Sequence, residues 1–142
     1  MGGSAVRSVA AVIAGFVATV VLSVACDAIV RMLAPGAFGP DGRTPGPVVA
    51  AGVAYTLLSA IAGGFVAALI ARRREVMHAL VLGTLGAVAT LLIIVAAPAT
   101  QRTVGMFVSA MLVIPATVLG GWLRARGRSG TGVPVAQPDD RG

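Results

Sequence analysis

Few side chains in this 142-residue sequence could do chemistry, and three of them fall at a similar depth in apolar stretches. The chain has five acidic residues, one histidine and one tyrosine. Asp27 is the only acidic residue inside an apolar stretch, where the desolvation cost of a carboxylate favours a functional role. Tyr55 and Ser109 lie at a similar distance from the ends of their own stretches. These three residues predict a small polar pocket that could bind a ligand or support a pH-dependent flux.

A structural role for Asp27 is the alternative interpretation. Arg31 follows Asp27 by one helical turn, and side chains at this spacing are neighbours on a helix surface. The two residues would then form an ion pair near the outer end of the first apolar stretch.

His78 is the second titratable candidate. It lies near Glu75 at the start of the third apolar stretch, at the opposite end from Asp27. We expect His78 to be an interfacial residue that bonds to Glu75 or to a backbone carbonyl. A proton relay between His78 and Asp27 is not expected, because no titratable residue lies between them.

Cysteine chemistry and catalysis find little support. Cys26 is the single cysteine, so we predict no internal disulfide and no metal site. The segment 22–26 resembles the end of a bacterial lipoprotein signal, in which the cysteine is lipidated after cleavage, but we favour an uncleaved first span. The Gly-Gly pairs at 63–64 and 120–121 lack the residues of a phosphate loop. No stretch offers two catalytic groups at one depth, so we expect neither an enzyme nor a cofactor.

Four apolar runs must position these residues, at about 9–30, 48–70, 76–97 and 104–123. Each approaches the ~20 residues that an α-helix needs to cross a bilayer. Composition agrees, because 57% of the residues are hydrophobic and only 11% are charged. We predict an all-α polytopic membrane protein, a four-transmembrane-helix bundle over residues 1–128. We expect residues 34–47 to form an irregular loop and 129–142 to form a disordered cytoplasmic tail.

The basic residues indicate topology rather than nucleic-acid binding. The formal net charge is +6, and the eleven basic residues are all arginines. Most of them flank one side of the four runs, namely Arg7, Arg72, Arg73, Arg74, Arg124, Arg126 and Arg128. The positive-inside rule then places both termini in the cytoplasm, and Trp122 would anchor at the same interface. A composition rich in arginine and free of lysine favours a bacterial inner membrane.

Small residues predict close helix packing, and they also suggest an internal repeat. The glycines Gly63, Gly64, Gly83, Gly120 and Gly121 lie at spacings that let helix backbones approach one another in lipid. Residues 15–22 resemble 86–93, and 63–66 resemble 120–123. Duplication of a helical hairpin would give this pattern, with two tandem hairpins in parallel. Chance matching in an Ala-, Gly- and Val-rich chain is the alternative.

One further pattern extends over about residues 50–124. Tyr55, Gly63-Gly64, Ala71-Arg72, His78-Ala79-Leu80 and Gly120-Gly121 occur in this order. In these motifs the chain resembles a loose group of small uncharacterised four-helix bacterial membrane proteins. The resemblance implies four spans and carries no activity.

Two functions remain open from the sequence. The first is a non-enzymatic membrane protein that acts by self-association as a homo-oligomer or by association with a larger membrane partner. The second is a small transporter or channel subunit with an outward-facing polar pocket around Asp27. Substitution of Asp27 separates the two, because only the second function depends on this carboxylate.

Overall fold

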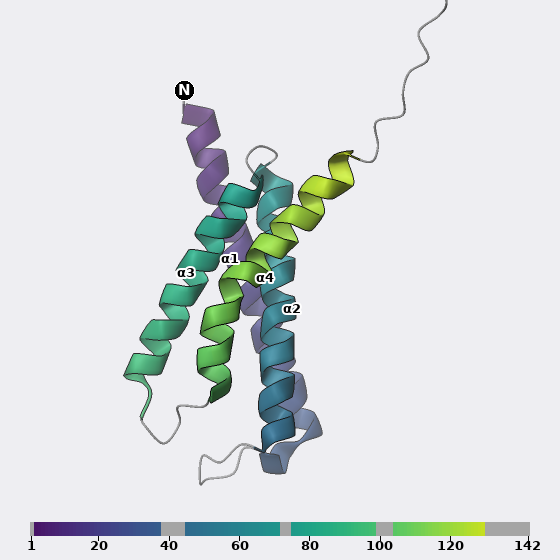
Figure 1. Cartoon of the computed structure of the whole chain (residues 1–142), viewed down its shortest axis with the longest axis vertical. Helices are drawn as coiled ribbons and strands as arrows, with labels where there is room; N and C mark the ends of the chain where they lie inside the picture. The colour runs from purple at the N-terminus through teal and green to yellow at the C-terminus, as the bar shows by residue number, and fades with distance from the viewer. Residues whose placement is uncertain (1, 38–44, 72–74, 99–103, 130–142) are drawn as a thin grey trace, which may run out of the picture.

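The computed structural model shows a bundle of four long helices (Figure 1). It describes residues 2–37, 45–71, 75–98 and 104–129. The long helices are α1 (Gly2–Leu33), α2 (Gly46–Ala71), α3 (Glu75–Ala96) and α4 (Val104–Ser129), and the short 3-10 helix η1 (Pro35–Ala37) follows α1. The predicted all-α four-helix bundle is confirmed.

Each long helix has the length and apolar character needed to cross a bilayer. The candidate spans are Val6–Leu33, Gly46–Ala71, Val76–Ala96 and Val104–Gly127. Many large aliphatic side chains on all four helices are exposed, including Leu33, Val95 and Met111. Apolar surface on this scale suits contact with lipid rather than with water. The four spans therefore indicate a membrane protein.

Some helix ends differ from the predicted runs. α1 begins before residue 9 and α4 continues to Ser129, because backbone hydrogen bonding extends into polar flanks that hydropathy does not mark. α2 includes Gly46 and Pro47, although the composition of 34–47 predicts a loop there. Proline is tolerated in a first helical turn, where its missing N–H is not needed. The amides of Val48 and Val49 donate to the Pro45 carbonyl at 2.9 and 3.1 Å. Residues 38–44 of the predicted loop and 130–142 of the predicted tail lie outside the described residues.

The helices alternate in direction, so the bundle has two distinct ends. We call the end that holds Leu33, Gly46, Ala96 and Val104 the loop end. The opposite terminal end holds the start of α1 and the end of α4, both at the top of Figure 1. α2 is the central helix, because it packs extensively against both α1 and α4 and also contacts α3.

Helices meet where their residues are small. Ala60, Ala67, Ala68 and Ala79 are fully buried. Ala60 belongs to a core cluster with Ala87, Val113 and Ala116. Because the buried side chains are short, the helix backbones approach one another closely, as is common in lipid.

The predicted packing glycines lie at these contacts. A Cβ atom at Gly64 of α2 would clash with the Thr117 carbonyl oxygen of α4, and one at Gly120 would clash with the Ile61 carbonyl oxygen of α2. Gly83 of α3 faces Thr117 as well, Gly63 contacts α1, and Gly121 is buried. The sequence interpretation missed Gly15, where a Cβ would lie 2.8 Å from the Gly63 carbonyl oxygen.

The two hairpins, α1–α2 and α3–α4, share local features. The Thr19 hydroxyl donates to the Gly15 carbonyl at 2.9 Å, and the Thr90 hydroxyl donates to the Gly86 carbonyl at 2.8 Å. These are matching positions of the proposed repeat. The crossing of α2 and α4 also places the two matching Gly-Gly regions against each other. α4 contains Pro115 and changes direction along its length in Figure 1, as expected where proline removes a helical hydrogen bond.

Candidate functional site

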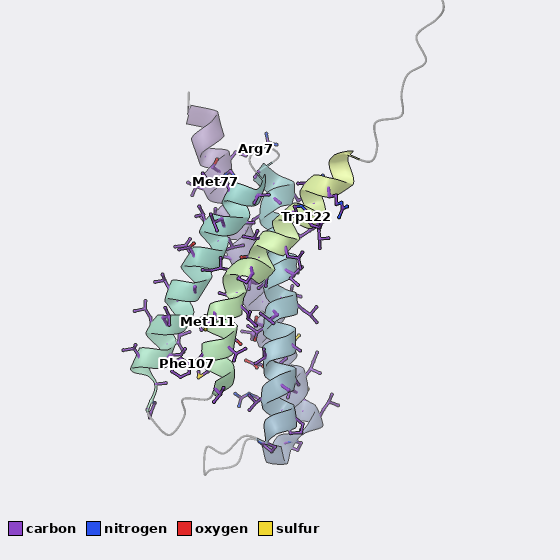
Figure 2. All side chains as sticks on the ribbon, in the orientation of Figure 1. Arg7, Met77, Phe107, Met111 and Trp122 are labelled. Atoms are coloured by element: carbon purple, nitrogen blue, oxygen red, sulfur yellow. The ribbon has the colours of Figure 1, made fainter. Side chains whose placement is uncertain are left out.

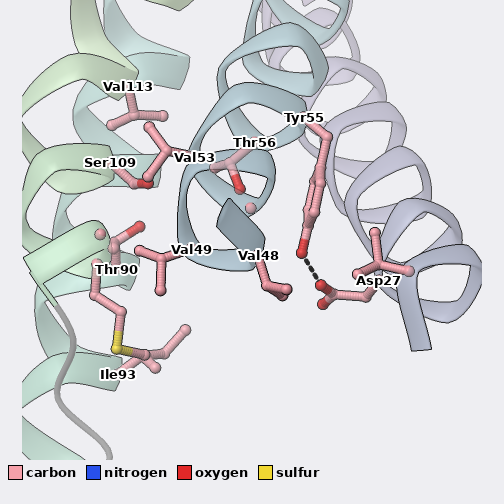
Figure 3. Close-up of a pocket in the computed structure, with 14 residues that line it drawn as sticks. Asp27, Val48, Val49, Val53, Tyr55, Thr56, Thr90, Ile93, Ser109 and Val113 are labelled. Carbon is pink, nitrogen blue, oxygen red and sulfur yellow. Dashed lines mark hydrogen bonds between the residues drawn. The ribbon is translucent and has the colours of Figure 1, made fainter. Parts of the chain in front are cut away.

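A partly open cavity of about 450 Å³ lies at the loop end (Figure 3). All four helices contribute to its wall. The lining residues are Asp27, Val30, Val48, Val49, Gly52, Val53, Tyr55, Thr56, Thr90, Ile93, Gly105, Met106, Ser109 and Val113. They come from roughly the three turns of each helix nearest the loop end, so the cavity reaches about 15 Å into the bundle at 1.5 Å per residue.

The cavity exists because the close helix contacts lie deeper in the bundle. Gly15, Gly64, Gly83 and Gly120 bring the backbones together beyond the reach of the lining residues. Toward the loop end the helices diverge, and Figure 1 shows α3 moving away from α2 in this direction. Valine and isoleucine side chains fill only part of the resulting space.

Asp27 and Tyr55 contact each other directly on one side of this cavity. The Tyr55 hydroxyl of α2 donates a hydrogen bond to Oδ1 of Asp27 on α1, shown as the dashed line in Figure 3. Both residues are half-buried. The bond occupies one carboxylate oxygen, and within the described parts of the chain the other oxygen, Oδ2, has no hydrogen bond. It also joins α1 to α2 near the loop end.

Ser109 lines the same cavity from α4. It is 9% exposed, and Figure 3 places it near Thr90 and Val113, away from the Asp27–Tyr55 pair. The structure therefore brings all three predicted pocket residues to one cavity but puts only Asp27 and Tyr55 in contact.

Arg31 lies one turn nearer to the end of α1 and is exposed. It is not among the lining residues. The Asp27–Arg31 ion pair stays a prediction.

Two threonines of the cavity were missed in the sequence. Thr90 precedes the last residue of α3 by as many positions as Asp27 precedes the last residue of α1. Counting residues from the helix ends would therefore have identified Thr90 as well. Thr56 shares a helix face with Gly52 at one-turn spacing. The Thr90 hydroxyl already donates to Gly86, so toward the cavity it acts only as an acceptor.

The remaining candidates lie at the terminal end, far from the cavity. Figure 2 labels Arg7, Met77 and Trp122 in this region. The Arg126 guanidinium stacks over the Trp122 ring at 4.7 Å, and the Arg7 Nε donates to the Ile70 carbonyl at 3.2 Å, which satisfies one of the last carbonyls of α2. His78 is half-buried in the first turns of α3. An interfacial role for His78 and Trp122 stays a prediction.

The described metal-ligating and thiol side chains are spread over the bundle. No group of three or more His, Cys, Asp or Glu side chains that could hold a metal ion occurs among the residues placed in the structure. Cys26 is a half-buried free thiol on α1. Lipidation of Cys26 stays untested.

We expect Tyr55→Phe to lower the free energy of unfolding by about 1 kcal/mol, because interhelical hydrogen bonds in membrane proteins contribute about 0.6–1.7 kcal/mol. Denaturant titration in detergent micelles, followed by circular dichroism, measures the change. Thr84→Val is the matched control, since the Thr84 hydroxyl bonds only to Leu80 on its own helix. A loss for Tyr55→Phe no larger than that of Thr84→Val would contradict an interhelical role for the tyrosine.

Comparison with known proteins identifies no relative: no family model, curated protein or solved structure matches the chain.

Proposed function

We propose that the protein is a small transporter or channel subunit that admits a small ligand into the cavity at the loop end. The observation that carries this proposal is one partly open cavity in which a carboxylate and several hydroxyls interrupt apolar walls supplied by all four helices. Pockets that bind small molecules commonly combine apolar walls with a few convergent polar groups, and their volumes run from about 300 to 1,000 Å³.

The arginine distribution supports an orientation for this cavity. Arg7, Arg124 and Arg126 belong to the terminal end, as do the arginines at 72–74 in sequence order. Fewer arginines, at positions 31, 43 and 102, flank the loop end. By the positive-inside rule both termini face the cytoplasm and the cavity opens to the outside of a bacterial inner membrane. A ligand would then enter from the extracytoplasmic face.

A cavity-filling substitution tests the proposal. Val49 lines the cavity, whereas Leu58 on the same helix is 66% exposed on the outer surface. We expect Val49→Trp to abolish saturable binding of three radiolabelled probes with similar phenyl bodies, measured on the full chain in lipid nanodiscs. The probes are tetraphenylphosphonium, triphenylphosphine oxide and tetraphenylborate, which are cationic, neutral and anionic.

Leu58→Trp is the matched control and should bind as the wild type does. Both variants should retain the wild-type helix content by circular dichroism. If the wild type binds none of the probes beyond the level of Val49→Trp, the proposed function is wrong.

Association with another membrane protein, or with a second copy, is the second candidate function. α1 favours it, because only 11% of its candidate span is buried, against 28–33% for the other three. Lipid alone would also cover this surface. Purification in mild detergent, with the mass of the complex and its co-purifying proteins identified, tests this candidate: a monomer without a partner would rule it out.

A further inference from the structure

We infer that the ligand class of the cavity is a monovalent organic cation with an apolar body, whose charge contacts the free carboxylate oxygen of Asp27. This inference rests on the proposed function, because it needs the cavity to be a binding site. It adds that the ligand carries a single positive charge and that the rest of the ligand surface is apolar.

The charge of the lining residues determines whether the cavity prefers a cation or an anion. Asp27 is the only acidic residue of the lining, and no arginine or histidine belongs to it. Tyr55 occupies Oδ1, which leaves Oδ2 as an acceptor on a carboxylate with no cationic partner in the lining. A charge held in apolar surroundings is costly without an opposite charge. Arg31 lies one turn away on α1 but outside the lining, so within the cavity a ligand cation supplies the opposite charge, and one carboxylate matches one positive charge.

The partial charges at the helix ends do not reverse this preference for a cation. α2 and α4 begin at the loop end, and their N-termini carry partial positive charge. α1 and α3 end there, and their C-termini carry partial negative charge of the same size. The four partial charges offset one another, so the carboxylate of Asp27 determines the charge preference.

The apolar walls select an organic cation over a metal ion. Val48, Val49, Val53, Ile93 and Val113 form most of the surface and offer no oxygen ligand from their side chains. A hard cation such as Ca²⁺ takes six or more oxygen ligands at short range. Here Ser109 and Thr90 lie on the far side of the cavity from the carboxylate (Figure 3). A cation with an apolar body uses both the charge and the walls.

The test compares the affinities of the same three probes on the full chain in nanodiscs. The binding of each probe to Val49→Trp is subtracted from its binding to the wild type, because this background includes partition of the probe into lipid. We expect the wild type to bind tetraphenylphosphonium at least about tenfold more tightly than triphenylphosphine oxide, or ~1.4 kcal/mol. Tetraphenylborate, of the same shape and opposite charge, should show the weakest binding.

Variants at position 27 assign the preference to the carboxylate. Asp27→Asn keeps the size of the side chain and should bind the cationic and neutral probes equally. Asp27→Glu keeps the charge and should retain the preference for the cationic probe. It keeps the inference testable if Asp27→Asn fails to fold. Arg31→Gln removes a nearby positive charge and should raise the affinity for the cation severalfold.

The outcomes separate this inference from the function beneath it. Equal binding of cation and neutral probe by the wild type, or a preference that survives Asp27→Asn, overturns the cation assignment while leaving the binding cavity in place. Absence of saturable binding of every probe overturns both.

Discussion

Gly64→Ala should destabilise the bundle by about 3 kcal/mol, at the upper end of the usual cost of overpacking. The added Cβ would meet the Thr117 backbone, including its carbonyl oxygen and, at 2.9 Å, its Cα atom. A backbone cannot rotate away as a flexible side chain can, so α2 and α4 must separate. Because α2 contacts every other helix, the whole bundle loses packing. Denaturant titration of the purified protein measures the change.

Gly86→Ala is the control for this prediction. It introduces the same methyl group into a helix, but its Cβ would lie 3.5 Å from Val113 Cγ2, an ordinary contact. Alanine also has a helix propensity better than glycine by about 1 kcal/mol, so this variant should be as stable as the wild type or more so. Equal stability of Gly64→Ala and Gly86→Ala would show that α2 and α4 do not cross at this glycine.

Gly15→Leu should release α1 from the bundle while α2, α3 and α4 stay packed. A Cβ at Gly15 would lie 2.8 Å from both the Gly63 carbonyl oxygen and the Ala67 Cβ, and 2.9 Å from Leu82 Cδ2. Within the described part of α1, only Ala11 and Gly15 are buried, so little else holds the helix in place. We expect the amides of α1 to lose protection in hydrogen exchange, and probe binding to fall because Asp27 leaves the cavity.

Ala10→Leu adds the same leucine at an exposed position of α1 and should change neither measurement. Protection of α1 that survives Gly15→Leu would mean that the Asp27–Tyr55 and Arg7–Ile70 contacts suffice to hold the helix. Loss of protection in α2 and α4 as well would mean that α1 is part of the cooperative core.

The sequence carried enough information for the helices but not for their arrangement. Runs of about twenty apolar residues leave only helices as a solution in lipid, because every backbone polar group must be bonded within the segment. The runs are apolar on all sides, so no polar face indicates how each helix is rotated or which helix is central. The central place of α2 and the contact of Gly15 with Gly63 therefore had to come from the structure.

The sequence predicted how deep in the bundle the candidate-site residues lie, but it did not predict the direction in which each side chain points. Counting residues from the helix ends placed Asp27, Tyr55 and Ser109 in one layer, and all three line the cavity. The same count could not show that the tyrosine meets the carboxylate while the serine lies across the cavity, since that depends on helix rotation. Thr56 and Thr90 were overlooked because threonine is common in apolar helices, where its hydroxyl bonds to its own backbone, as Thr90 does.

On the predicted duplication of a helical hairpin, which stays a prediction, the crossing of α2 over α4 has a consequence for the history of the chain. It places Gly64 of the first hairpin against Thr117 and Gly120 of the second hairpin against Ile61, so each hairpin supplies one glycine to a contact surface of matching form. A lone hairpin with such a surface would pair with its own copy, at a stoichiometry set by its abundance in the membrane. Covalent fusion replaces that dependence with a high effective concentration, which also frees the two halves to diverge. The carboxylate of Asp27 has no acidic counterpart at the matching Pro98, as such divergence would produce.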